Sequence, residues 1–170
     1  IIVPGQWSMQ GFQVDSAAFA GYRTTFTLPA DWQGRCVKLR FDGVSSEYQV
    51  YLNGTEIGYH MGGMTAYEID ITRHLKTGKN DLALAVRSES LADMLGSLTQ
   101  YAAHQLGGIT RKVTLFALPE THISDLRIET GLDKQYENAE LKIFTAITNT
   151  TAKTQNNLSL RLSIAGLPGI

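Results

Sequence analysis

Several features that would point to common protein classes are missing from this sequence. Cys36 is the only cysteine, which excludes an internal disulfide. No apolar run approaches the roughly 18 residues of a membrane-spanning helix, so we expect no membrane partner. Lys and Arg total 15 against 16 Asp and Glu, without a basic stripe, which argues against nucleic acid. A cytoplasm and a bacterial periplasm are both compatible with these absences, and the compartment stays unknown.

The start of the chain also lacks the usual signals. It begins IIVPGQW, with no initiator methionine and no charged and apolar signal segment. We therefore expect these 170 residues to be cut from a longer polypeptide. The composition is 43% hydrophobic and 18% charged, which is typical of a folded domain. The length suits one domain plus part of another.

The clearest local signal is a β-hairpin at residues 48–60. Asn53-Gly54 lies between two runs of strand-forming residues, and this dipeptide favours a two-residue turn with positive φ at both positions. Tyr48, Val50 and Leu52 then share one face of the first strand, which we expect to be buried.

Other segments show the same period-2 alternation of apolar and polar residues. Strands are predicted at residues 22–28, 36–42, 66–71, 82–86 and 110–118, and beyond Pro119 at residues 122–130, 139–149 and 158–165. A single helical turn is predicted at residues 72–75. Strands that do not alternate with long helices indicate an all-β, antiparallel fold.

Residues 88–108 form the exception. This segment, SESLADMLGSLTQYAAHQLGG, has no alternation, although Leu91, Met94 and Leu95 have the spacing of a short helix. Connections longer than about 12–15 residues are uncommon and are often functional. The 88–108 segment is therefore the best functional candidate in the sequence.

The order of these pieces resembles the N-terminal part of glycoside hydrolase family 2 enzymes, most closely the β-galactosidases. Four stretches carry the resemblance: VPGQW at residues 3–7, YRTTFTLPADWQGRCVKLRFDGV at 22–44, YLNGTEIGYHMGGMTAYEIDITRHLKTGKNDLALAV at 51–86, and GGITRKVTLFALPETHISDLRI at 107–128.

The resemblance implies a domain organisation. Residues 1–119 would form a galactose-binding-like jelly roll, and residues 120–170 a truncated immunoglobulin-like β-sandwich. The two catalytic glutamates of the family belong to a following barrel domain, which this chain lacks. The fragment would then be non-catalytic, with no cofactor. It would support the barrel, frame its pocket for a β-galactoside or related carbohydrate, and contribute to a homo-oligomer.

The resemblance also directs attention to particular residues. The matching loop of family β-galactosidases carries an acidic, Trp-containing motif that reaches the active site, and Asp93-Met94 is its counterpart, although no Trp-Arg follows. His104 or Gln105 could donate to a sugar hydroxyl, and Tyr101 could stack on a pyranose ring. Scattered histidines with no ligand spacing predict no metal site.

Two other functions remain open at this point. One is an autonomous carbohydrate-binding module, and the other is an interaction or adhesion sandwich that uses an exposed sheet edge. Tyr48, Tyr51, Tyr59 and Tyr67 could form a sugar platform, but strand spacing favours core and cross-strand pairs. Glu68 and Asp70 share a strand face and could approach each other, although a solvated face is the expected arrangement.

Overall fold

Strands make up nearly all the regular structure of the computed structural model, which describes residues 1–96 and 106–163. The chain divides into two compact units, Ile1–Pro119 and Glu120–Ile170. Every strand pair found in the described ranges is antiparallel. The predicted all-β, antiparallel class is therefore confirmed. Within the same ranges, no helix combines the length and the apolar character needed to cross a membrane.

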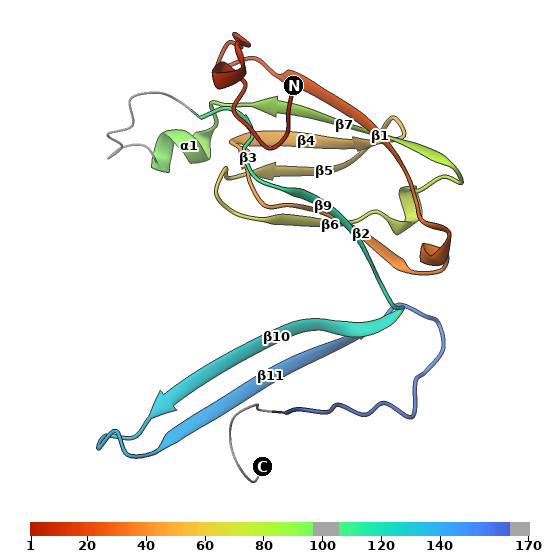
Figure 1. The fold of residues 1–170 in the computed structure, drawn as a ribbon, viewed down its shortest axis with the longest axis vertical. Coiled ribbons are helices and arrows are strands. Elements are labelled where there is room, and N and C mark those ends of the chain that lie inside the picture. The colour runs from red at the N-terminus through yellow and green to blue at the C-terminus, as the bar shows by residue number, and fades with distance from the viewer. Residues whose placement is uncertain (97–105, 164–170) are drawn as a thin grey trace. The chain divides into compact units, whose positions relative to one another are not determined.

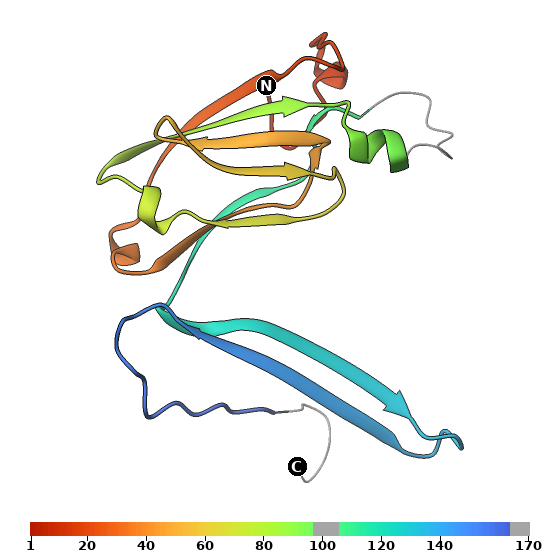
Figure 2. The same cartoon turned by 180° about the vertical axis from the view of Figure 1, so that it is seen from behind.

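Two larger sheets and one short strand pair form the first unit (Figure 1; Figure 2 from behind). The four-stranded sheet has the order β1-β7-β4-β5, with bounds Ala20–Thr27, Lys79–Arg87, Glu47–Leu52 and Thr55–Met61. The three-stranded sheet has the order β6-β2-β9, with bounds Tyr67–Asp70, Cys36–Phe41 and Val113–Leu118. A short pair joins β3 (Val44–Ser45) to β8 (Gly108–Ile109), and the 3-10 turns are η1 (Ser8–Gln10), η2 (Ala30–Trp32) and η3 (Thr72–His74).

The core lies between these sheets, where alternate residues of each strand meet. Buried positions include Val37, Leu39 and Phe41 of β2, Tyr48, Val50 and Leu52 of β4, and Leu82, Leu84 and Val86 of β7. These are the inward faces that the alternation predicts, because successive side chains of a strand point to opposite sides.

The predicted hairpin is confirmed. Asn53 adopts the backbone conformation that the turn requires, and its side chain forms hydrogen bonds to a neighbouring segment. Asn53 and Gly54 have φ of 54° and 86°, as the two-residue turn requires. The Asn53 amide donates to the His74 carbonyl and to Asn80 Oδ1, both at 2.9 Å, and its Oδ1 accepts from the Asp81 amide at 3.1 Å. The turn is thus tied to the segment that leads into β7.

Replacing Asn53 with alanine should cost about 2 kcal/mol of folding free energy, because alanine disfavours positive φ and the three hydrogen bonds are lost. Asn53→Gly is the matched control, since it keeps the backbone geometry but lacks the side chain. Urea unfolding should rank the parent first, Asn53→Gly second and Asn53→Ala last. If Asn53→Ala were the most stable of the three, the turn assignment would be wrong.

In the second unit, β10 (Thr121–Leu132) pairs with β11 (Ala139–Asn149) to form a two-faced ribbon. One face is apolar and carries Ile123, Leu126, Ile128, Leu132, Leu141, Ile143 and Ile147. The opposite face carries Arg127 over the Phe144 ring and the ion pair between Lys142 and Glu140. Both strands agree with the sequence prediction.

The third strand predicted for this unit is not formed in the part that the structure describes. Residues 158–163 have no ladder partner and are not strand, while residues 164 and 165 lie outside the described ranges. The alternation of Leu158, Leu160 and Leu162 suits a strand, but a strand also needs a neighbour for its backbone N–H and C=O groups. The pattern alone could not supply that neighbour.

Candidate functional site

The 88–108 segment leaves and rejoins the sandwich at one end of the first unit. It follows β7, includes the predicted short helix as α1 (Leu91–Gly96), and leads into β8. Of the four sequence candidates, Asp93 lies in α1, and its side chain is not among those described. Tyr101, His104 and Gln105 lie outside the described residues. Their role in substrate binding therefore stays a prediction.

The start of the segment is held by a buried polar cluster that consists of Ser46, Glu47, Arg87 and Ser90. The Ser46 hydroxyl donates to the Ser90 hydroxyl at 2.6 Å, and the Ser46 amide donates to the Arg87 carbonyl at 2.8 Å. Arg87 Nε donates to Glu47 Oε2 at 3.1 Å, and Arg87 Nη2 contacts the same oxygen. The Glu47 side chain is only 8% exposed and the Arg87 side chain 32%, so the carboxylate is the buried member of this ion pair.

Two aromatic side chains complete the cluster. The Tyr59 hydroxyl donates to Glu47 Oε1 at 3.1 Å, and the Arg87 guanidinium lies 5.0 Å from the centre of the Phe19 ring. Desolvation, followed by the bond to Glu47, raises the pKa of Tyr59. Both Glu47 oxygens are therefore bonded, as a buried carboxylate requires. No local pattern predicts this cluster, because alternation assigns Glu47 to the outer face of β4.

The end of the segment is fixed by close packing. A Cβ at Gly107 would lie 2.3 Å from Trp7 Cε2 and Cζ2, and one at Gly108 would lie 2.6 Å from the Tyr22 hydroxyl. Trp7 is 5% exposed, and its amide donates to the Gly107 carbonyl at 3.2 Å. These glycines therefore serve close approach of backbone to aromatic rings. Together with the polar cluster, they attach both ends of the 88–108 segment to the sandwich.

Three apolar side chains of helix α1 are exposed to solvent. Leu91, Met94 and Leu95 are 57%, 50% and 63% exposed. The helix starts beside the buried cluster, since the Met94 amide donates to the Ser90 carbonyl at 2.9 Å. An exposed apolar group on a well-anchored helix is a typical feature of a surface that contacts another protein part.

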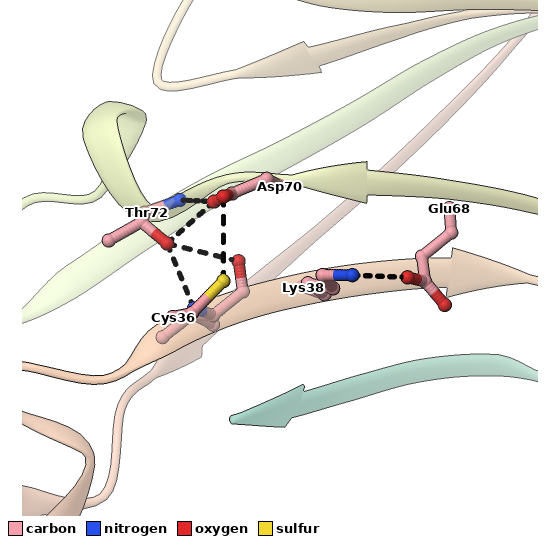
Figure 3. A network of polar contacts seen from close by, with 6 residues as sticks. Cys36, Lys38, Glu68, Asp70 and Thr72 are labelled. Carbon is pink, nitrogen blue, oxygen red and sulfur yellow. Dashed lines mark hydrogen bonds and ion pairs between the residues drawn. The ribbon is translucent and has the colours of Figure 1, made fainter. Parts of the chain in front are cut away.

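Glu68 and Asp70, both in β6, bind different partners. Figure 3 shows that each is engaged separately: Glu68 binds Lys38 at 2.7 Å, while Asp70 accepts from the Thr72 hydroxyl at 2.6 Å and from the Cys36 thiol at 3.4 Å. Burial opposes the ionisation of Asp70, but hydrogen bonds from Thr72 outweigh it and lower the pKa of Asp70. Burial also raises the pKa of the Cys36 thiol, which disfavours its nucleophilic form.

The Asp70 network predicts a pH dependence of stability. Since folding lowers the pKa of Asp70 below its ordinary value of 3.8, the carboxylate stabilises the fold above that pH. The contribution is lost as the pH falls through the lower, folded-state pKa. Because Asp70 is exposed and water screens its interactions, Asp70→Asn should cost less than about 1 kcal/mol at pH 7 and progressively less below pH 4. Urea midpoints measured from pH 7 to pH 2 check this, and a constant difference between parent and variant would contradict it.

The four tyrosines proposed as a sugar platform do not share one surface. Tyr48 is fully buried, and its ring contacts Phe41, His60 and Tyr67 at centroid distances of 5.3, 5.6 and 6.3 Å. Burial raises the pKa of Tyr48. Tyr59, in contrast, is 45% exposed. The core interpretation therefore holds for Tyr48. Among the described residues, no group of three or more His, Cys, Asp or Glu side chains could hold a metal ion.

Residues 1–119 match the family model described as glycosyl hydrolases family 2, sugar binding domain. The chain is 35% identical over 128 residues to a β-galactosidase of Priestia megaterium, which covers 75% of this chain and 12% of that protein. It is also 35% identical over 149 residues to a putative β-glucuronidase of Formosa agariphila, which covers 88% of this chain and 18% of that protein.

One solved structure with a similar fold is also a β-glucuronidase. The crystal structure of Bacteroides uniformis β-glucuronidase superposes with a TM-score of 0.69 at 28% identity, over 84% of this chain and 18% of that one. The chain thus spans less than a fifth of the length of each of these relatives.

Proposed function

The chain belongs to glycoside hydrolase family 2 through its sugar-binding domain, and on that premise we propose that it is a non-catalytic part of a β-galactosidase-like enzyme. The first unit would support a catalytic barrel of the same polypeptide and frame its substrate pocket with the 88–108 segment. The observation that carries this proposal is the double attachment of that segment, through Ser46 and Glu47 at its start and Trp7 at its end.

The chemistry of the described carboxylates supports a non-catalytic role. A retaining glycosidase needs two carboxyl groups about 5–5.5 Å apart on either side of the scissile bond. The most plausible pair from the sequence, Glu68 and Asp70, is instead divided between Lys38 and Thr72. Reaction chemistry would therefore come from outside these residues, and this chain would contribute shape and binding.

The second unit would be the beginning of an immunoglobulin-like sandwich. Its β10–β11 ribbon has one apolar face, and a lone two-stranded ribbon is at best marginally stable in water. A sandwich buries such a face against a second sheet. On this proposal, further strands of the intact protein cover Leu126, Ile128 and the other apolar side chains of that face.

The pocket-framing role can be tested in the intact enzyme with Asp93. Asp93→Ala should raise KM for nitrophenyl β-galactoside by about tenfold, the usual effect of losing one polar contact worth about 1.4 kcal/mol. Glu56→Ala is the matched control, because Glu56 is exposed beside the hairpin turn, away from the 88–108 segment. Equal KM values for the parent and both variants would count against substrate contact by Asp93.

A second candidate function is direct sugar binding by the isolated chain, which the description of the matching family model favours. Calorimetric titration with galactose and with glucuronic acid separates the two proposals. The supporting role predicts no heat of binding by the 170 residues alone, since most of the pocket lies elsewhere. Millimolar or tighter binding that Tyr101→Ala abolishes would favour the autonomous module.

A further inference from the structure

The hairpin turn contains the only Asn-Gly dipeptide in the sequence, Asn53-Gly54. Asparagine is a chemically labile residue, and a following glycine has no side chain to hinder attack by its own backbone nitrogen. In that attack the Gly54 nitrogen bonds to Asn53 Cγ, the Cγ–Nδ2 bond breaks, and the NH₂ group leaves with the Gly54 amide proton as ammonia. Water then opens the five-membered imide to aspartate or isoaspartate, so the reaction needs no oxidant or reductant.

Burial does not protect this dipeptide from the reaction. Asn53 is half-buried and Gly54 is exposed, at the tip of the hairpin that β4 and β5 form. Among the described residues, nothing lies within 4 Å of a Cβ built at Gly54. Water can therefore reach the turn, and any protection has to come from the conformation in which the asparagine is held.

Hydrogen bonds hold the Asn53 side chain at both of its polar atoms. Nδ2 donates to the His74 carbonyl and to Asn80 Oδ1, each at 2.9 Å, and Oδ1 accepts from the Asp81 amide at 3.1 Å. The backbone is tied to the same segment, because the Asn53 amide donates to the Asp81 carbonyl at 2.8 Å. Ring closure requires Cγ to swing towards the Gly54 nitrogen, and this rotation would take Oδ1 and Nδ2 away from their partners.

Asn80, which supplies one of these partners, is itself fixed. It is fully buried, its Oδ1 accepts from the Lys76 amide at 2.8 Å, and its Nδ2 donates to the Lys76 and Gly78 carbonyls at 3.0 and 3.1 Å. Turning this amide over would break all three bonds, so Asn80 presents an oxygen to Asn53. An aspartate at position 53 would face this oxygen and the His74 carbonyl, and neither can donate a hydrogen bond to a carboxylate.

We propose that Asn53-Gly54 is a deamidation site whose reactivity the fold controls. The closed turn suppresses the reaction, and separation of the turn from residues 74–81 permits it. Because the reaction proceeds only from the open turn, its rate in the folded protein is reduced by the small fraction of molecules in which the turn is open. The carboxylate product cannot rebuild the bonds to His74 and Asn80, so each event permanently weakens the attachment of the hairpin tip.

The test follows deamidation of the 170-residue chain at mildly alkaline pH, in native buffer and in concentrated urea. Digestion and mass spectrometry measure the reacted fraction at Asn53, and a synthetic peptide of residues 51–56 gives the rate without a fold. Asn80→Ala removes the side-chain partner of Asn53. Asp81→Ala is the matched control, because it keeps the backbone groups that bind Asn53 and removes a side chain that is 48% exposed.

In native buffer the parent should deamidate at least about tenfold more slowly than the peptide, and in urea at a rate within about threefold of the peptide. Folded Asn80→Ala should react at least about threefold faster than the parent, whereas Asp81→Ala should stay within about twofold of it. Thermal melts verify that both variants are folded. A folded parent that reacts as fast as the peptide would overturn the proposal, as would a folded Asn80→Ala that reacts no faster than the parent.

Asn53→Asp tests the second part of the proposal and does not depend on the folding of Asn80→Ala. This variant has the side chain of the aspartate product, and it should melt at least about 4 °C below the parent. A melting temperature equal to that of the parent would show that the turn accepts the carboxylate, and would overturn the claim that deamidation weakens the hairpin tip.

Discussion

Gly107→Ala should be among the most damaging single substitutions in the first unit. The new methyl group would lie 2.3 Å from two ring carbons of Trp7, and that ring is 5% exposed and enclosed by the core. Overpacking of this kind typically costs 1–3 kcal/mol and occasionally more, and the rigid neighbour puts this case at about 3 kcal/mol. The melting temperature should then fall by about 10 °C.

Gly21→Ala is the control for this experiment. It introduces the same methyl group on a strand, but nothing lies within 4 Å of the new Cβ. Calorimetric melts should show a change of no more than about 2 °C for Gly21→Ala. Equal melting temperatures for Gly107→Ala and the parent would show that Trp7 can move, and the end of the 88–108 segment would then not be fixed by packing.

Arg87→Ala should destabilise the fold to a similar extent through a different mechanism. It leaves Glu47, whose side chain is 8% exposed, with only the Tyr59 hydroxyl as a partner. Removing one member of a buried ion pair typically costs 3–5 kcal/mol, and because Arg87 is 32% exposed we expect about 3 kcal/mol. Urea unfolding at pH 7 measures the loss.

Two further variants separate burial from loss of charge. The double variant Glu47→Gln with Arg87→Met should recover most of the lost stability, because no buried charge is then left unpaired. Lys38→Ala, which breaks the more exposed pair with Glu68, should cost less than about 1 kcal/mol. A double variant as unstable as Arg87→Ala alone would contradict the account of the cluster.

The first unit was largely predictable because its signals are local. Asn53-Gly54 defines a turn within four residues, and period-2 alternation defines each inward face, as in Val37, Leu39 and Phe41. Such signals depend only on near neighbours in the chain. From these signals the antiparallel class, the strands of this unit and the short helix at Leu91 were predicted where the structure has them.

The features that depend on distant residues were not predictable in the same way. Glu47 and Arg87 are 40 positions apart, and alternation assigns Glu47 to an outer face that Tyr59 and Phe19 in fact help to cover. The sequence also does not show that Gly107 and Gly108 are required by the close approach of Trp7 and of the Tyr22 hydroxyl, which lie far from them in the chain. The order of the strands within each sheet is a further case, because no local pattern records it.

The proposed substrate contacts form a third case. The prediction for Asp93 rests on resemblance and not on pattern, and its counterpart motif departs from the family after Met94. What the structure adds is the attachment of the segment that carries it, at Ser90 and at Gly107. That attachment fixes the two described ends of the segment on the sandwich.

The most direct test of the central claim is the release of nitrophenol from nitrophenyl β-galactoside and nitrophenyl β-glucuronide. The 170-residue chain and the intact polypeptide that contains it should be assayed side by side at equal concentration. We expect no release above the uncatalysed rate from the 170 residues and turnover of one of the two substrates by the intact protein. Hydrolysis by the 170 residues alone would contradict the account, and so would an intact protein that hydrolyses neither glycoside.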